Sequence, residues 1–227
     1  MLRFLTAGES HGPAVSVILK GMPSGLPLGA EDIDPDLARR QKGFGSGGRM
    51  KIEKDRVQIL GGVMHGHTIG APICLQVRNL DHVKWQGKAV PPLTTPRPGH
   101  ADLTGAVKYG YRDLRFSLER ASARETTARV AAAAVCRKLL AEFGVSVGSY
   151  VTEIGSVTAD LSDVSIEERA ARADECDVRC PNPKAAEAMR AHIREAMEAR
   201  DTLGGVFEVM ALGVPPGLGS HVHWDRK

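Results

Sequence analysis

The sequence predicts an α+β fold, and two observations support this prediction. Apolar, partly alternating runs predict strands at 3–7, 14–19, 71–77, 145–157 and 205–214. Helical periodicity predicts helices at about 34–42, 118–143 and 185–200. Strands therefore come in runs with helices between the runs, whereas a doubly wound parallel sheet would place a helix after each strand. No repeat or low-complexity linker divides the 227 residues, so we expect one domain over 1–227.

Local signals define the first helix and the loops. Asp34 is expected to be the N-cap of that helix, because its side chain can accept from the free backbone N–H groups of the first turn. Pro35 would then occupy the first helical position, where no N–H is needed. The segments 21–29 and 88–98 are rich in proline and glycine and are expected to be loops.

Two further elements are predicted, a hairpin and a long helix. The stretch 50–60 predicts a hairpin that turns at Lys54 and Asp55. Residues 118–143 carry the strongest helical pattern, because alanine, leucine and valine occupy one broad face. Gly144 lies directly beyond this pattern, where a helix commonly ends.

The composition is that of an ordinary globular chain. Hydrophobic residues make up 42% and aromatic residues only 4%, so the core must consist mainly of aliphatic side chains. The formal net charge of +3 is too small to indicate a nucleic-acid partner. No signal peptide and no apolar run of membrane-spanning length is found. We therefore expect a cytoplasmic chain with neither a membrane nor a nucleic-acid partner.

Metal binding is not predicted. His65 and His67 form one H-x-H pair, and His221 and His223 form another. Such pairs share one face of a strand and can ligate a metal ion, but no further ligands stand at a recognisable spacing. The four cysteines also lack the paired spacing of a zinc site, so reduced thiols are expected.

The glycine tract 43–48 matches the letters G-x-G-x-x-G. A dinucleotide fingerprint needs a strand before the tract and a helix N-terminus after it, so that the helix dipole meets the pyrophosphate. Here a basic helix precedes the tract and a strand is expected after it. A flexible loop that closes around a ligand between Arg40 and Arg49 fits this order, and so does an ordinary helix-to-strand loop.

Two histidines follow glycines in unusual settings. His11 lies in Gly8-Glu9-Ser10-His11-Gly12 at the end of a predicted strand, and His100 follows the proline-rich loop. Histidine is the commonest general acid or base, so both are candidates for proton transfer. Histidines that merely occupy turns are the alternative. Asp102 could orient His100 or cap the following segment.

Arginines gather near the start of the longest predicted helix. Arg120 and Arg124 are four residues apart, so they would share a helix face. At a helix N-terminus they add to the positive end of the dipole, which is unfavourable unless an anion binds there. Pairing with Glu119 or Glu125 is the alternative interpretation.

Three blocks carry a resemblance to a known family. They are Gly8-Glu9-Ser10-His11-Gly12, Arg97-Pro98-Gly99-His100-Ala101-Asp102 and Arg120-Ala121-Ser122-Ala123-Arg124-Glu125-Thr126. Shorter matches are Arg39-Arg40-Gln41, Gly48-Arg49-Met50-Lys51-Ile52-Glu53, Gly204-Gly205-Val206 and Ala211-Leu212-Gly213-Val214-Pro215-Pro216-Gly217-Leu218-Gly219. In this order the blocks resemble those of the chorismate synthases, over essentially the whole chain.

The resemblance implies a fold, a reaction and an assembly. The family fold is a β-α-β sandwich with helices between antiparallel sheets, and the family assembles as a homotetramer. The implied reaction is the 1,4-elimination of phosphate from 5-enolpyruvylshikimate 3-phosphate to give chorismate, a step of the shikimate pathway. It requires reduced FMN, for which NADPH is a candidate reductant.

The resemblance also implies roles for individual residues. His11 would protonate the leaving phosphate, and His100 would protonate the reduced flavin or steady its charge. The residues expected to bind substrate are Ser10, Arg49, Arg97 and Arg124. The residues expected to bind FMN are Arg120, Ala121 and Ser122. Arg40 is expected to bind NADP or substrate.

The chain departs from the family in three ways. Ser46 stands where the family usually has an arginine that contributes to substrate or NADP binding. The loop 85–95 is shorter than usual, and family chains are much longer than this one. We therefore expect a chorismate synthase-like chain truncated at its C-terminus. A truncated or degenerate module without activity of its own is the alternative.

Overall fold

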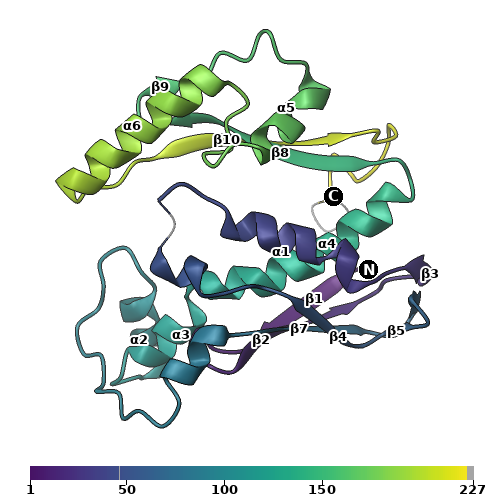
Figure 1. Cartoon of the computed structure of the whole chain (residues 1–227). Coiled ribbons are helices and arrows are strands. Elements are labelled where there is room, and N and C mark those ends of the chain that lie inside the picture. The colour runs from purple at the N-terminus through teal and green to yellow at the C-terminus, as the bar shows by residue number, and fades with distance from the viewer. Residues whose placement is uncertain (46, 224–227) are drawn as a thin grey trace. The chain divides into compact units, whose positions relative to one another are not determined.

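The computed structural model describes residues 1–45 and 47–223, except for the side chains of Met50 and Lys51. The described chain forms two compact units. Unit 1 comprises 1–41 and 47–136, and unit 2 comprises the described parts of 42–46 and 137–227. Antiparallel sheets combined with helices confirm the predicted α+β class (Figure 1). The expectation of a single domain stays a prediction.

Unit 1 contains most of the strands. Its strands are β1 (Arg3–Ala7), β2 (Ala14–Lys20), β3 (Ser24–Pro27), β4 (Val57–Gly61), β5 (Val63–Met64), β6 (His67–Ile69) and β7 (Ile73–Arg78). Its α-helices are α1 (Asp34–Gln41), α2 (Asp102–Tyr109), α3 (Arg115–Arg120) and the first part of α4 (Thr126–Ala141). Short 3-10 helices are η1 (Ala30–Asp32), η2 (Gly48–Lys51), η3 (Leu80–Lys84) and η4 (Ala123–Glu125).

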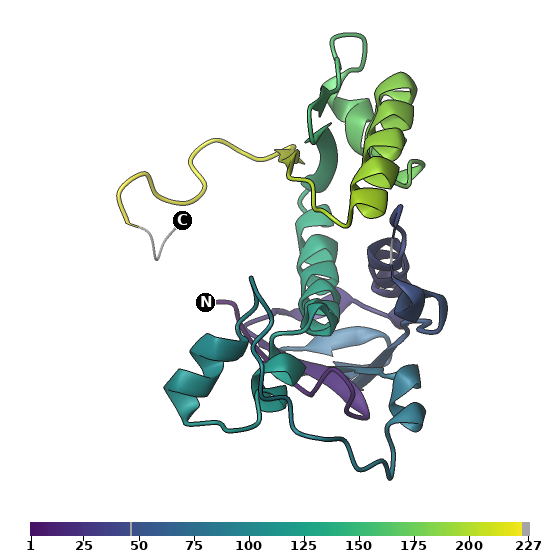
Figure 2. The same ribbon diagram turned by 90° about the vertical axis from the view of Figure 1, so that its left-hand side faces the viewer.

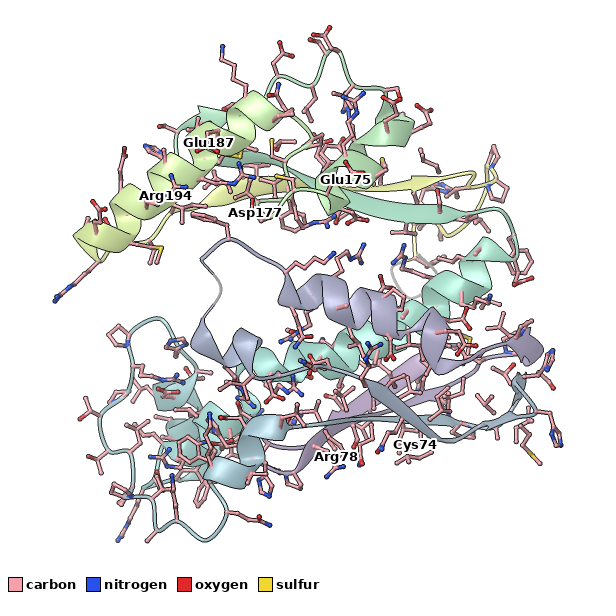
Figure 3. All side chains as sticks on the ribbon, in the orientation of Figure 1. Cys74, Arg78, Glu175, Asp177, Glu187 and Arg194 are labelled. Carbon is pink, nitrogen blue, oxygen red and sulfur yellow. The ribbon has the colours of Figure 1, made fainter. Side chains whose placement is uncertain are left out.

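The main sheet of unit 1 has the order β1-β2-β7-β4, and every pair is antiparallel. Val17 and Leu19 of β2 are buried, whereas Ile18 between them is exposed, because successive side chains point to opposite faces. Helices α1 and α4 cover the buried face (Figures 1 and 2). Cys74 and Arg78 of β7 point away from these helices, on the other face (Figure 3).

The segment 21–29, predicted as a loop, contains a short strand. Within it β3 pairs with β6 in a second sheet of order β3-β6-β5. Thr68 explains the pairing, because its buried hydroxyl donates to Pro23 O at 2.7 Å and accepts from Leu26 N–H at 3.0 Å. A side chain more than 40 residues away therefore decides the conformation, and local glycine and proline content could not reveal it.

The predicted hairpin over 50–60 is wrong. The chain instead forms η2, then a turn, and then β4, which pairs with β7. Glu53 and Asp55, expected near an exposed turn, are both buried. Their carboxylates turn inward to arginines, and this charge pairing overrides the alternating pattern that suggested a hairpin.

The predicted long helix over 118–143 is interrupted. Helix α3 ends at Arg120, Ser122 is extended with φ −70° and ψ 148°, and α4 begins at Thr126. The hydroxyl of Ser122 accepts from Arg124 N–H at 3.2 Å, a local bond that competes with continuous helix. Arg120 and Arg124 therefore do not share a helix face, contrary to the prediction.

Asp34 also differs from its predicted role as N-cap. It is the first residue of α1, and its Oδ1 accepts from Val57 N–H at 2.9 Å. Its Oδ2 accepts from Arg56 Nη1 at 3.1 Å. The carboxylate thus ties the start of α1 to the start of β4 instead of capping the helix.

Unit 2 combines a sheet of order β10-β8-β9 with two helices. Its elements are the last part of α4, β8 (Ser146–Ile154), β9 (Val157–Thr158), α5 (Ile166–Asp174), α6 (Pro183–Ala199) and β10 (Gly205–Leu212). Asn182 caps α6 by accepting from Ala185 N–H at 3.0 Å, and Pro183 follows it. The predicted helix at 185–200 and the strands at 145–157 and 205–214 are confirmed within a few residues, whereas α5 was not predicted.

The described part of the glycine tract is anchored within unit 2. Phe44 packs against the core cluster around Met189, and its N–H donates to Asp177 O at 3.0 Å. The guanidinium carbon of Arg194 lies 5.3 Å from the centroid of the Phe44 ring. Figure 3 labels Asp177 and Arg194 beside α6. The prediction for Ser46 concerns a position outside the described residues.

Candidate active site

The turn after β1 needs a glycine at position 8. Gly8 has φ +103°, and a Cβ atom there would lie 2.3 Å from Ala14 O. The amide nitrogen of Asn79 donates to three carbonyls of this turn, those of Glu9, Ser10 and Gly12, at 3.1, 3.2 and 2.7 Å. A buried side chain thus holds the loop that presents Ser10 and His11. The importance of Asn79 was not recognised in the sequence.

A cavity of about 280 Å³ opens beside this turn in unit 1. Its walls are formed by Ser10, His11, Arg49, Arg97, His100, Leu118, Ala121, Ser122 and Ala123. The structure therefore brings together both predicted histidines, two of the predicted arginines and the serines of two separate motifs. The break between α3 and α4 supplies one wall, because it leaves residues 121–123 outside both α-helices.

His11 is held on several sides. Its Nδ1 lies 2.7 Å from Glu119 Oε1, and its backbone N–H donates to Glu119 Oε2 at 2.8 Å. The Trp85 ring packs against the imidazole with centroids 4.2 Å apart. His82 Nδ1 lies 2.8 Å from the His11 carbonyl oxygen. His100, by contrast, is exposed, and its backbone N–H donates to Arg97 O at 3.4 Å.

Hydroxyl groups link two of the predicted motifs. Arg49 Nη1 donates to Ser10 Oγ at 2.8 Å, and Ser10 Oγ donates to Ser122 Oγ at 2.9 Å. Ser122 Oγ also accepts from Arg124 N–H. With these donors occupying its lone pairs, the Ser122 hydroxyl proton has no acceptor among the described residues. It can therefore donate to a ligand in the cavity.

Arg97 forms a bidentate pair with Asp102. Nε and Nη2 of Arg97 donate to the carboxylate at 2.8 and 2.9 Å, and the Arg97 backbone N–H donates at 3.0 Å. Asp102 is completely buried, whereas the Arg97 side chain is 39% exposed. Asp102 therefore orients Arg97 toward the cavity. Both interpretations offered by the sequence, orientation of His100 and capping, lack support in these contacts.

The same hydrogen bonds from Arg97 hold the pKa of Asp102 at about 2, below its ordinary 3.8. A depressed pKa in the folded state stabilises the fold above pH 3.8, and this contribution is lost as the pH falls toward 2. We expect the Asp102 carboxyl resonance to titrate near pH 2 by NMR. Asp102→Asn should remove the corresponding acid-dependent part of the unfolding free energy. A midpoint near pH 3.8 would contradict the assigned ion pair.

Beside the cavity, Arg40, Arg49 and Arg124 form a charge cluster with the buried carboxylates of Glu53 and Asp55. Arg124 Nη1 contacts Asp55 Oδ1 at 2.6 Å, Arg40 Nη1 contacts Asp55 Oδ2 at 3.5 Å, and Arg49 Nη2 contacts Glu53 Oε1 at 3.2 Å. Burial lowers the pKa of the Arg40 guanidinium, an effect that Asp55 opposes. Three guanidinium groups against two carboxylates leave one positive charge in excess, which favours an anion nearby.

The remaining predicted residues take different places. The Arg124 side chain is 1% exposed, and its other donors contact Asn79 Oδ1 at 2.6 Å and Arg78 O at 3.0 Å. It therefore lies beneath the cavity and does not line it. Arg120 is exposed and donates to Gly8 O. Arg40 uses its other donors on Thr126 Oγ1 and Ala123 O, at 3.0 and 2.8 Å.

The comparisons with known proteins agree on one family. The chorismate synthase family model matches residues 2–227. The chain belongs to the chorismate synthase family. A chorismate synthase of Rubrobacter xylanophilus is 56% identical over 98% of this chain and 59% of its own length. One of Brevibacillus brevis is 54% identical over 100% of this chain and 61% of its own length.

A solved structure supports the same assignment. A crystal structure of chorismate synthase matches with a TM-score of 0.83 and 46% identity, covering 99% of this chain and 62% of that chain. This likeness confirms the predicted chorismate synthase type of fold. The chain spans about three fifths of the length of the curated chorismate synthases that it matches, 59% and 61% in the two relatives named above.

Within 1–45 and 47–223, no helix combines the length and apolarity needed to cross a membrane. In the same part of the chain, no group of three or more histidine, cysteine, aspartate or glutamate side chains is arranged to hold a metal ion. The H-x-H pair of His65 and His67 therefore has no further protein ligands among these residues.

Proposed function

We propose that the protein carrying this chain is a chorismate synthase, a carbon–oxygen lyase that eliminates phosphate from 5-enolpyruvylshikimate 3-phosphate. One observation carries the proposal: the cavity joins His11 and His100 to Arg49 and Arg97. The substrate bears a phosphate and two carboxylates, and guanidinium groups recognise such anions with paired hydrogen bonds. A leaving phosphate also needs a proton donor, which His11 can be.

The residues present fit FMN in part. The cavity has a cationic wall, and Ser122 retains an unused hydroxyl proton on the segment that resembles the FMN-binding block. Its volume of about 280 Å³ lies just below the range of about 300–1,000 Å³ of ligand pockets. The described residues therefore account for one side of a site that must hold both substrate and flavin. Ala121 and Ser122 line that side, and Arg120 flanks it.

The residues of this chain would divide the chemistry between them. Arg49 and Arg97 bind and orient the anionic groups, and Asp102 keeps Arg97 in place. His11 transfers a proton to the leaving phosphate, and exposed His100 is available to the flavin side. Reduced FMN, when bound, supplies transient electron density to the substrate. The cationic surroundings stabilise the negative charge that develops on the phosphate.

Other features of the proposal rest on family membership. NADPH is proposed as the reductant, with Arg40 as a contact. Arg40 belongs to the charge cluster, and its guanidinium donates to Thr126, Asp55 and Ala123. Ser122 and the buried Arg124 remain proposed parts of the flavin and substrate sites. Assembly as a homotetramer and a cytoplasmic location are likewise proposals drawn from the family.

An anaerobic assay tests the function directly. The natural polypeptide that contains these residues should convert the enolpyruvyl phosphate to chorismate and phosphate in the presence of photoreduced FMN. The absence of chorismate would refute the proposal. The 227-residue chain, assayed in parallel, tests the alternative of a module without activity of its own.

A further inference from the structure

Glu119, from a distant segment of the sequence, forms hydrogen bonds with the turn that carries His11. Glu119 is the penultimate residue of α3 and lies 108 positions from His11 in the sequence. Its two carboxylate oxygens contact His11 Nδ1 at 2.7 Å and the His11 backbone N–H at 2.8 Å. Its backbone carbonyl accepts from Ser10 N–H at 3.1 Å. Side chain and main chain of Glu119 together therefore hold two successive residues of the turn.

These contacts select one form of the imidazole. An ionised carboxylate only accepts hydrogen bonds, so the proton between the two groups lies on His11 Nδ1. No hydrogen-bond partner of Nε2 occurs in the part of the chain that the structure describes. Trp85 packs on the ring with an interplanar angle of 44°, which restricts rotation of the imidazole. Because His11 lines the cavity, Nε2 is the ring nitrogen left for a ligand.

We propose that Glu119 is a positioning residue that holds His11 in the Nδ1–H form, so that Nε2 transfers the proton to the leaving phosphate. The proposal rests on the function proposed above. The step is a proton transfer: the Nε2–H bond of the imidazolium breaks, an O–H bond to the phosphate forms, and the electron pair stays on Nε2. Glu119 remains ionised throughout and steadies the imidazolium before transfer.

The role of Glu119 differs from that of a carboxylate in a surface ion pair. Glu119 is followed by Arg120, yet the recorded side-chain bonds of Arg120 go to Gly8 O and to Thr6. Both oxygens of Glu119 are directed instead to His11. The segment that ends α3 therefore contributes its one carboxylate to the histidine and not to a surface ion pair.

The first test needs no substitution. In the 227-residue chain labelled with ¹⁵N, above the pH at which His11 loses its charge, long-range ¹H–¹⁵N spectra should show a protonated Nδ1 and an unprotonated Nε2. Free neutral histidine in water favours the opposite tautomer. Observation of an Nε2–H tautomer for His11 would overturn the proposal, whether or not the protein makes chorismate.

Variants test the role of the carboxylate. Glu119→Leu removes both acceptors at similar size, and His11 should lose its preference for the Nδ1–H form. If the leucine variant folds poorly, Glu119→Asp takes its place. It keeps a carboxylate acceptor and should retain part of the preference for the Nδ1–H form. Glu125→Gln is the matched control, because Glu125 contacts Thr6 and Arg129 and not His11. An unchanged His11 tautomer in Glu119→Leu would refute the positioning role.

Kinetics separate positioning from a purely structural role. In the active polypeptide, Glu119→Leu should lower kcat by about 10–100-fold, the range found when the hydrogen-bond partner of a metal-ligating histidine is removed. KM should stay within about twofold, because Glu119 does not line the cavity. If Glu119→Leu changes the His11 tautomer but leaves kcat unchanged, the proposal that Glu119 supports proton transfer is overturned. If the wild-type polypeptide makes no chorismate while His11 holds the Nδ1–H form, the proposed function fails and the His11–Glu119 pair stands.

Discussion

Replacing His11 by alanine is expected to slow chorismate formation by about 10²–10⁴-fold, the usual contribution of a positioned general acid. The loss should appear in kcat, because the arginines that bind the substrate anions remain. Folding should change little, since His11 lies at a turn on the cavity wall and its side chain is partly exposed. Anaerobic turnover with reduced FMN, together with urea unfolding of the variant and the wild type, measures both effects.

The control for this variant is His67→Ala. His67 is an exposed histidine on β6, in the second sheet of unit 1. Its ring nitrogen Nδ1 lies 3.0 Å from His65 O, and it lines no part of the cavity as the described residues form it. Turnover should therefore be unaffected. Equal rates for His11→Ala and His67→Ala would remove His11 from the mechanism.

Replacing Arg124 by methionine is expected to reduce the unfolding free energy by about 3–5 kcal/mol, because it leaves a buried carboxylate without its main partner. Asp55 is fully buried and lies 2.6 Å from Arg124. Arg40, at 3.5 Å, compensates only in part. Urea denaturation of the chain, followed by circular dichroism, gives the value.

Two further variants make this prediction specific. Arg124→Met combined with Asp55→Leu removes both charges and should restore much of the lost stability, since the penalty comes from the unpaired charge. Arg129→Ala breaks an exposed ion pair with Glu125 and should cost less than about 1 kcal/mol. If Arg124→Met were as mild as Arg129→Ala, the buried cluster would not be the stabilising centre assigned to it.

The sequence predicted the elements that depend on local patterns. Strands β1, β2, β7, β8 and β10 and helix α6 lie within a few residues of the expected positions. The hairpin and the uninterrupted long helix failed for a common reason. Glu53, Asp55 and Arg124 bury their charges against one another, and no local window contains all three. Pairing between distant segments therefore overrides periodicity at these positions.

The candidate site also contains residues that the sequence predicted and supporting residues that it did not. His11 and His100 were recognisable because glycines precede or flank them in the sequence, whereas Ser10 and Arg97 were predicted only from the resemblance to the family. Their supporting partners were not, because Glu119 is 108 positions from His11 and Asn79 is 69 positions from Ser10. The carboxylate of Asp102 stands five residues from Arg97, so that pair was within reach of an argument from spacing.

Asn79 couples two parts of the protein that the sequence keeps apart. Its amide nitrogen holds three carbonyls of the His11 turn, while its amide oxygen accepts from Arg124 Nε at 2.6 Å. Aspartate at this position would lose the donors, and leucine would lose both functions. A longer glutamine would not fit the same short span. The position thus tolerates little chemical variation, because one side chain must both donate to the turn that carries His11 and accept from Arg124 in the charge cluster.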